Sequence, residues 1–426
     1  MQEFRNPSLF LKTQLIRQRR TFEIQMLAKR FTYPSPGFSH YWNYGAGNKM
    51  LKKINHVSGK EEIEKFAELL YEYDITGDNV IQELYIKTGY HKANELIDTA
   101  LEKGIDSVND APVCLKQLFK EVDKVPEWLD MDLLNSGSQF CRRVGVFGLI
   151  VLRNYCLMGG YESSAINKPL IYTEALKKGA AKRMAETIEF WVNVTGDGAM
   201  KPHAIGFNSA VKVRLMHAFA RATIMKVPTW DNEVWGVPIN QCDMIATNLG
   251  FSIIFTEGLR RLGFRPTERE VKGVLHLWKY IGYLLGIPSD QLPDTEEHAI
   301  QLIYKWTMFQ SPADEDTKAL ALALKNEPLL ASYPKYKWQK KALIKLHLGY
   351  NYYFLDNRAC QTMGLPKTSF RYLPYLAKCM NAGAEYFNKP RRPFYNSAVK
   401  LGRMSQEKIK TAFLSGHASA LAQYKH

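Results

Sequence analysis

Apolar residues recur at helical spacing through most of this chain, and strand patterns are nearly absent from it. Residues 61–73, 93–103 and 113–122 carry apolar side chains three and four positions apart, which places those side chains on one face of a helix. We find no series of alternating apolar and polar residues separated by Asn-Gly or Asp-Gly turns. The sequence therefore predicts an all-α fold.

Two later stretches carry the end signals of helices. Thr267 and Glu270 form a capping-box pattern that opens a helix, and Gly286 is placed to end it. Asn240 is a favourable N-cap for another helix, which is expected to run to Gly263. These signals predict helices that begin and end within a few residues of those positions.

The 426 residues contain no repeat and no low-complexity linker, so we expect one large helical body. A basic N-terminal arm with helices is expected at 1–125, a central core at 126–300, and a C-terminal helical segment with a basic tail at 301–426. Six scattered cysteines without a CxxC pair indicate reduced thiols rather than a disulfide framework or a zinc site.

The positive charge of the chain is concentrated at its two ends. Residues 1–60 contain eleven Lys and Arg against two Glu, and residues 389–426 contain eight against one. Such ends favour an acidic partner, for which an anionic membrane surface and nucleic acid are the candidates, or they are solvated tails. We expect no specific nucleic-acid binding, because no recognition motif accompanies the charge.

The sequence predicts no transmembrane segment and no secretory signal. The longest apolar run, residues 144–152, is too short to cross a bilayer as a helix, and the N-terminus lacks an apolar signal region. Residues 1–20 interleave Leu and Phe with Arg, a pattern typical of a basic amphipathic helix on a membrane. We expect a cytoplasmic protein, with a peripheral position at a membrane surface as the alternative.

A histidine lies in the middle of an apolar helix face. In residues 211–225, His217 shares a face with Val213, Ala220 and Ile224. A buried imidazole either finds a hydrogen-bond partner in the core or binds a ligand, since an unpaired one costs about 1–3 kcal/mol. Both interpretations of His217 are open from these residues alone.

Charged and hydroxyl residues accompany this histidine. Arg183 and Thr187 lie one turn apart in a predicted helix at 182–191, where Glu186 is a possible i,i+3 partner of Arg183. Arg214 and Arg221 flank His217 at i−3 and i+4. Cations oppose a bound divalent metal, but they suit a macrocycle with carboxylates such as haem, which needs one axial base and an apolar slot.

Three longer segments follow Arg183 and Thr187 in order: VRLMHAFAR at 213–221, WGVPINQCDMIATNLGFSIIFTEGLRRLGF at 235–264 and LWKYIGYLLGIPSDQLP at 277–293. Their order and spacing resemble the catalytic-domain family of MpaB-type oxygenases and latex clearing proteins over roughly residues 125–300. The resemblance implies a haem b (iron) cofactor in an all-α body with a globin-like core.

By this resemblance His217 is the axial ligand of the haem iron, and Arg183 and Thr187 lie near the haem on the other helix. Arg214 and Arg221 are further candidates for binding the cofactor. Latex clearing protein has a lysine just before the Thr that can act as a distal ligand, where this chain has Glu186. Either the distal site is open or holds water, or Glu186 approaches the iron or serves as a proton-transfer group. The other interpretation is that Glu186 is only a partner of Arg183.

The function implied is a haem-dependent oxygenase, an oxidoreductase that uses dioxygen on an apolar unsaturated substrate such as an isoprenoid or lipid, by oxidative C=C cleavage. Two alternatives remain. One is a haem-binding sensor, carrier or peroxidase-like protein without alkene cleavage. The other is a non-catalytic helical protein that docks on acidic surfaces.

Overall fold

The computed structural model describes residues 27–173, 180–332 and 334–415, and every regular element within these ranges is a helix. The all-α prediction is therefore confirmed. The amphipathic helix expected at residues 1–20 lies outside the described residues. None of the described helices is both long and apolar enough to cross a membrane.

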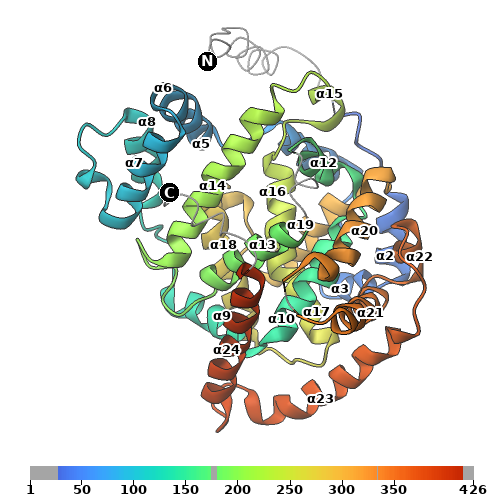
Figure 1. The fold of residues 1–426 in the computed structure, drawn as a ribbon. Coiled ribbons are helices and arrows are strands. Elements are labelled where there is room, and N and C mark those ends of the chain that lie inside the picture. Colours follow the sequence, from blue (N-terminus) through green and yellow to red (C-terminus); the bar gives the residue numbers. More distant parts are fainter. Residues whose placement is uncertain (1–26, 174–179, 333, 416–426) are drawn as a thin grey trace.

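The N-terminal helices form two groups. One group, α5 to α8, lies together at the upper left in Figure 1, against α14; the other, α2 to α4, packs near α19. In chain order the elements are α2 (Pro36–Tyr44), α3 (Gly47–Leu51), α4 (Lys60–Ala67), η1 (Glu68–Tyr71), α5 (Ile75–Val80), η2 (Ile81–Tyr85), α6 (Ile86–Thr88), α7 (Tyr90–Lys103), η3 (Ile105–Ser107) and α8 (Val113–Val122).

The central helices make up the middle of the molecule (Figure 1). They are α9 (Met131–Arg143), α10 (Val146–Val151), η4 (Leu152–Leu157), α11 (Met158–Gly160), α12 (Ser164–Tyr172), α13 (Ala180–Val194), α14 (Ile205–Ile224), α15 (Asn232–Trp235), α16 (Gln241–Leu249), η5 (Gly250–Ile254), α17 (Phe255–Arg261) and α18 (Glu268–Leu284).

The predicted helix ends in this region are confirmed. The Asn240 side chain accepts a hydrogen bond from the Asp243 backbone nitrogen at the start of α16, and Thr267 and Glu270 form the reciprocal capping box of α18. Gly286 follows α18 with a positive φ of 86°, a conformation that ends a helix and that glycine adopts without strain.

The C-terminal helices wrap the lower and right sides of the body in Figure 1, where α23 runs along the lower edge. They are η6 (Ser289–Gln291), α19 (Glu296–Met308), α20 (Glu315–Leu330), α21 (Lys337–Phe354), α22 (Asn357–Thr362), η7 (Ser369–Tyr372), α23 (Leu373–Asn388) and α24 (Tyr395–Leu414). Helix α24 returns to pack on α9 and α13.

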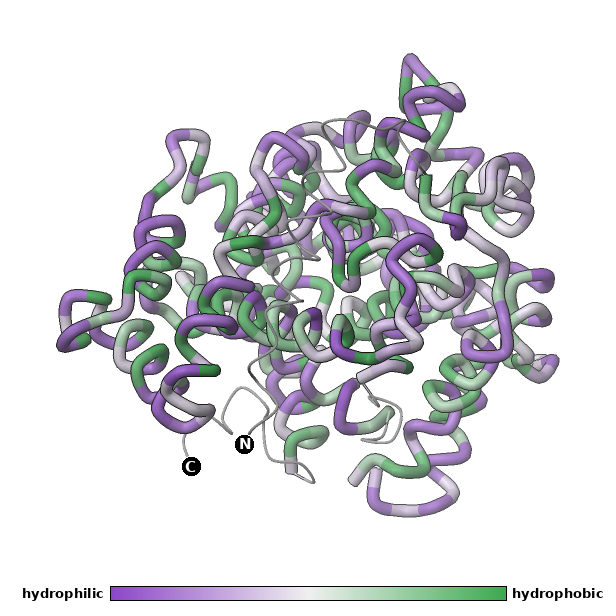
Figure 2. The backbone as a smooth tube through the Cα atoms, turned by 90° about the horizontal axis from the view of Figure 1, so that it is seen from above, coloured by the Kyte–Doolittle hydropathy of each residue, from purple (hydrophilic) through white to green (hydrophobic). Residues whose placement is uncertain are grey.

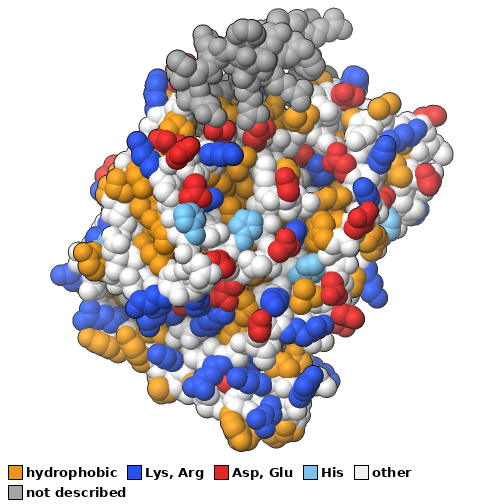
Figure 3. All heavy atoms as spheres, turned by 180° about the vertical axis from the view of Figure 1, so that it is seen from behind, with side chains coloured by type: hydrophobic (Ala, Val, Ile, Leu, Met, Phe, Trp, Pro, Cys, Tyr) orange, Lys and Arg blue, Asp and Glu red, His pale blue; other side chains and the backbone are white. Residues whose placement is uncertain are grey.

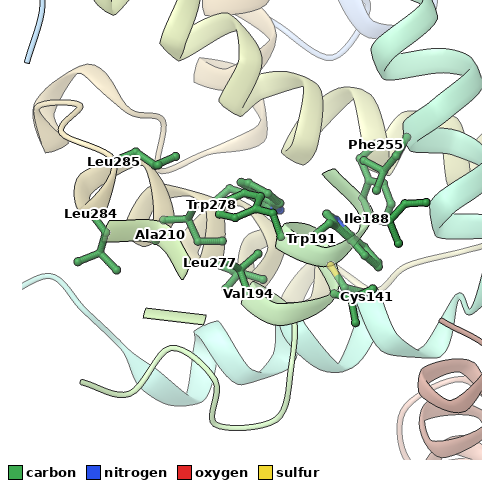
Figure 4. Close-up of a cluster of buried hydrophobic side chains, with 14 of the residues drawn as sticks. Cys141, Ile188, Trp191, Val194, Ala210, Phe255, Leu277, Trp278, Leu284 and Leu285 are labelled. Carbon is green, nitrogen blue, oxygen red and sulfur yellow. The ribbon is translucent and has the colours of Figure 1, made fainter. Parts of the chain in front are cut away.

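The main hydrophobic core combines residues of the N-terminal, central and C-terminal helices, and a second buried cluster joins residues 28–70 to residues 242–309. Its buried residues run from Val80 to Leu365, and Figure 2 shows hydrophobic and hydrophilic residues alternating within single helices, as expected when amphipathic helices surround a shared core. In the close-up of Figure 4, Trp191 from α13 lies near Trp278 from α18, and both indoles are fully buried. This shared core agrees with one helical body. The segment boundaries and the globin-like relation stay predictions.

Candidate functional site

A large cavity of about 830 Å³ lies inside the helical body, near the upper end of the range for small-molecule and cofactor sites. Its walls are mostly apolar and include Leu149, Phe190, Leu215, Phe251 and Ile254. Such walls exclude water from polar groups that point inward, and they accommodate an apolar ligand.

All three π-helical segments of the described chain border this cavity. Tyr85 from η2, Tyr155 from η4 and Phe251 from η5 line it. A π-helical segment inserts an extra residue into a helix and shifts its side chains, and such segments are frequent at functional sites. The helix backbone thus departs from regular α geometry in three segments that line the cavity.

His217 lines the cavity from α14. Its Nδ1 is buried and has no hydrogen-bond partner among the described residues. Burial, together with the positive charges of Arg221 and Arg183, lowers the pKa of His217 to about 4, so the ring is neutral at pH 7. An uncharged imidazole that lines a large cavity keeps a lone pair on one ring nitrogen and so has the chemistry of a metal ligand.

Arg183, Glu186 and Thr187 line the same cavity from α13. Helix α13 packs against α14, so the structure brings all three together with His217. The Thr187 hydroxyl donates to the Arg183 backbone oxygen at 3.0 Å, which leaves its oxygen lone pairs to accept. The Arg183 guanidinium has no ion pair or hydrogen bond within the described part of the chain, and therefore keeps its donors for an anionic or oxygen-containing ligand.

The structure places Arg214 and Arg221 elsewhere. We expected both near a cofactor, yet neither lines the cavity. Arg214 donates to both carboxylate oxygens of Asp74 at 2.7 Å and to Glu121 at 2.9 Å, and Arg221 donates to Asp78 at 2.9 Å. Their guanidinium groups fasten α14 to the N-terminal helices, because those helices supply the carboxylates.

A pair of tyrosines that no sequence motif marks also lines the cavity. The hydroxyl oxygens of Tyr41 and Tyr155 lie 2.7 Å apart, and both residues border the cavity. Burial raises the pKa of each phenol, so both stay protonated at neutral pH. Nothing in the local sequence pairs these residues, since 114 positions separate them.

His276, a histidine of α18, has a structural role. Its Nε2 accepts a hydrogen bond from the Asp130 backbone nitrogen at 2.8 Å, and its ring meets the Trp128 indole edge-on. It does not line the cavity. Of these two histidines, His217 is therefore the candidate for binding a ligand in the cavity.

The residues in the cavity fit a haem b. The group needs an axial base, a wide apolar slot and a cation for its carboxylates, and His217, the apolar walls and the unpaired Arg183 supply these three. No comparable site for a bare metal ion exists among the described residues, which contain no group of three or more His, Cys, Asp or Glu arranged to hold one.

Comparison with known proteins gives three matches. Residues 145–382 match the family model described as ER-bound oxygenase mpaB/B′/rubber oxygenase, catalytic domain. The rubber oxygenase of Streptomyces sp. (strain K30) is 26% identical over 239 residues, which span 54% of this chain and 56% of that protein. The structure of latex clearing protein LCP in the closed state is similar with a TM-score of 0.65 at 19% identity, over 82% of this chain and 92% of that one.

The structural match and the family model support different conclusions. The match spans little more than half of the rubber oxygenase, and identity to the solved structure is low. The structural likeness therefore carries the fold, while the family model covers more than half of the chain and includes the helices that bear His217, Arg183 and Thr187.

Proposed function

This chain belongs to the mpaB and rubber oxygenase catalytic-domain family, and from that membership we propose that it is a haem b-dependent oxygenase acting on an apolar unsaturated substrate. The observation that carries the proposal is the meeting of an unpartnered imidazole, His217, with an unpaired guanidinium, Arg183, in one large apolar cavity. A buried imidazole nitrogen is costly to leave without a partner, and a guanidinium at an apolar wall binds an anionic group readily.

His217 would bind the haem iron through its imidazole, since its low pKa leaves the ring neutral with a lone pair to donate. Arg183, unlike Arg214 and Arg221, has donors left that would bind a carboxylate of the haem or stabilise negative charge that develops in the reaction. Bound haem supplies dioxygen activation, which side chains do not provide by themselves.

Thr187 and Glu186 are the proposed polar groups beside the reacting atoms. The hydrogen bond from Thr187 to the Arg183 carbonyl fixes the rotamer of the hydroxyl, whose oxygen then accepts a hydrogen bond from a neighbour in the cavity. Glu186 is proposed to hold or release a proton at its carboxylate oxygens. The apolar walls keep bulk water away from these groups, which strengthens their electrostatic effect.

The proposed substrate is an isoprenoid or similar unsaturated hydrocarbon, and the proposed reaction inserts dioxygen across a C=C bond and cleaves it to two carbonyls. The wide apolar cavity and the rubber oxygenase relative support this class of substrate. A hydrocarbon offers no polar handle, so shape and burial of apolar area must supply most of its binding free energy.

An absorption spectrum of the purified chain, loaded with haem, tests the ligand assignment. We expect a Soret band in the parent that is lost or shifted in His217→Ala, because the imidazole ligand is gone. The matched control is His276→Ala, which removes a histidine outside the cavity and should keep the parent spectrum. An unchanged Soret band in His217→Ala would contradict the assignment of His217 as a ligand of the haem iron.

A haem protein without oxygenase activity is the second candidate, and Glu186 favours it, because latex clearing protein has a lysine at this position. Oxygen uptake with a linear isoprenoid hydrocarbon separates the two. Carbonyl products formed with stoichiometric oxygen consumption support the oxygenase. A haem-loaded chain that consumes no oxygen with such substrates supports a sensor or carrier.

A further inference from the structure

Helix α23 contacts the body through the Tyr375 ring, which meets Tyr353 of α21 in an edge-to-face contact, and through polar side chains. The Asn381 side chain donates to the Leu262 backbone oxygen at 3.0 Å. The Glu385 carboxylate accepts from the Arg265 backbone nitrogen at 2.8 Å and pairs with the buried Arg143 guanidinium. Asn381 and Glu385 are two of the three buried residues of this helix, so its inward face is largely polar.

The outward face of the same helix is apolar. Leu376, Met380 and Tyr386 are 62%, 65% and 64% exposed. An amphipathic helix of a globular protein normally turns its apolar face to the core. In α23 the polar face is turned to the core, and apolar side chains are exposed. We call this surface the outer face of α23, defined by the exposed residues Tyr375, Leu376, Met380, Tyr386, Phe387 and Phe394.

The surroundings of the outer face are strongly basic. Glu385 and Glu407 are the only acidic residues between positions 367 and 410. Glu385 is buried in its ion pair, and Glu407 is paired with Arg403 and Lys410 at 2.6 and 2.7 Å. The exposed cations in this part of the chain include Lys378, Arg391, Arg392 and Lys400, and the Arg392 guanidinium lies 5.1 Å from the centroid of the Tyr386 ring.

Seen from behind, the lower end of the molecule, where α23 and α24 lie, shows Lys and Arg side chains gathered with hydrophobic ones (Figure 3). Apolar and aromatic residues next to cations, on a surface with almost no free carboxylate, have the chemistry of the interface of a negatively charged bilayer. Trp and Tyr side chains are enriched at the membrane–water interface, because each combines an apolar ring with a polar N–H or O–H group.

We propose that the outer face of α23 docks the protein on an anionic lipid bilayer, with its apolar side chains among the acyl chains and its cations at the headgroups. The inference does not depend on the proposed oxygenase activity. A bilayer is nevertheless a medium in which an apolar substrate dissolves.

Charge argues against a second copy of this chain as the occupant. A symmetric dimer through this face would set the same cations opposite one another, with no exposed acidic residue between positions 367 and 410 that is not already paired. Like charges brought together across an interface oppose association. An anionic lipid surface supplies the missing negative charge.

Co-sedimentation of the full chain with vesicles tests the proposal. We expect binding to vesicles of phosphatidylcholine with phosphatidylserine, little binding to phosphatidylcholine alone, and release at high salt. The double variant Leu376→Asp/Met380→Asp should weaken binding by more than about tenfold, since two apolar anchors become anions. Arg391→Glu/Arg392→Glu should weaken it by about tenfold or more, because each cation contributes near the surface.

The control for Arg391→Glu/Arg392→Glu is Lys116→Glu/Lys120→Glu on the exposed side of α8. This control changes the net charge by the same amount on a different helix and should bind vesicles as the parent does. All substituted side chains are exposed, so thermal unfolding should stay unchanged and reports on folding separately. Two results overturn the proposal: variants of the outer face that bind vesicles as tightly as the parent, or a dimer in sedimentation velocity that Leu376→Asp/Met380→Asp abolishes.

Discussion

Arg214 carries a buried positive charge that carboxylates from other helices neutralise. Its guanidinium is 4% exposed and donates to Asp74, which also caps α5 by accepting from the Gly77 backbone nitrogen. Burial alone would raise the pKa of Asp74, but the charge and hydrogen bonds of Arg214 outweigh it, and the pKa lies below its ordinary value. The pair therefore positions α14, the helix of His217, against the N-terminal layer.

Replacing Asp74 by Asn should lower the free energy of unfolding by about 3 kcal/mol at pH 7, because a buried guanidinium loses its main partner. A carboxyl whose pKa is lowered by folding stabilises fully above its unfolded pKa of about 3.9 and loses that effect as pH falls through the folded value. Urea unfolding should therefore show the gap between parent and variant shrinking below about pH 4.

The control for this prediction is Asp98→Asn, which removes the less buried partner of Lys212 on the same helix and should cost at most about 1 kcal/mol. Equal losses in the two variants, or a gap for Asp74→Asn that persists unchanged at pH 3, would contradict the assignment.

At the scale of elements, α9 and α18 cross with their backbones in contact. A Cβ on Gly273 would lie 2.5 Å from the Gly137 backbone nitrogen, and one on Gly137 would lie 2.2 Å from the Gly273 carbonyl. Backbone atoms cannot move aside as a flexible side chain can, so glycine is required at both positions. This crossing holds Trp278, which lines the cavity, in its place.

Gly273→Ala should destabilise the protein by roughly 1–3 kcal/mol or more, because the added methyl group forces the two helices apart. Gly383→Ala is the matched control: the position is helical, and a Cβ there meets nothing within 4 Å. Alanine at 383 should raise stability by about 0.5–1 kcal/mol through helix propensity. Thermal unfolding of both variants checks the opposite signs, and the same sign for both would refute the packing argument.

At the scale of the whole molecule, parts of the chain outside the family match also line the cavity. Phe38 and Tyr41 from α2 and Tyr85 and Tyr90 from η2 and α7 line it, whereas the match begins at residue 145. The carboxylates that hold Arg214 and Arg221 come from the same N-terminal region. The N-terminal helices are therefore part of the site.

Removing residues 1–125 should abolish cooperative thermal unfolding and haem retention. The buried guanidinium groups of Arg214 and Arg221 would lose their carboxylate partners, and apolar side chains of the core would be exposed to water. The full chain, purified and loaded with haem in the same way, is the control. If the chain lacking residues 1–125 unfolds cooperatively with the parent's Soret band, the central region folds and binds alone, as a separate domain would.

Much of the helical framework could be predicted from local sequence. The caps at Asn240 and Thr267 lie as expected, because a cap depends on residues only three positions apart. The place of His217 and Arg183 on facing helices also followed from the order of motifs. In contrast, helical spacing put Arg214 and Arg221 beside His217 but did not reveal that their long side chains turn to carboxylates in the N-terminal layer.

The sequence by itself determined the all-α class, the helix ends and the family, because these depend on short-range periodicity and on motifs in linear order. The tertiary structure alone decided the cavity, the Tyr41–Tyr155 contact, the partners of the two arginines and the outward apolar face of α23. Each of these depends on which helix faces meet, and that outcome is set by packing among residues far apart in the chain.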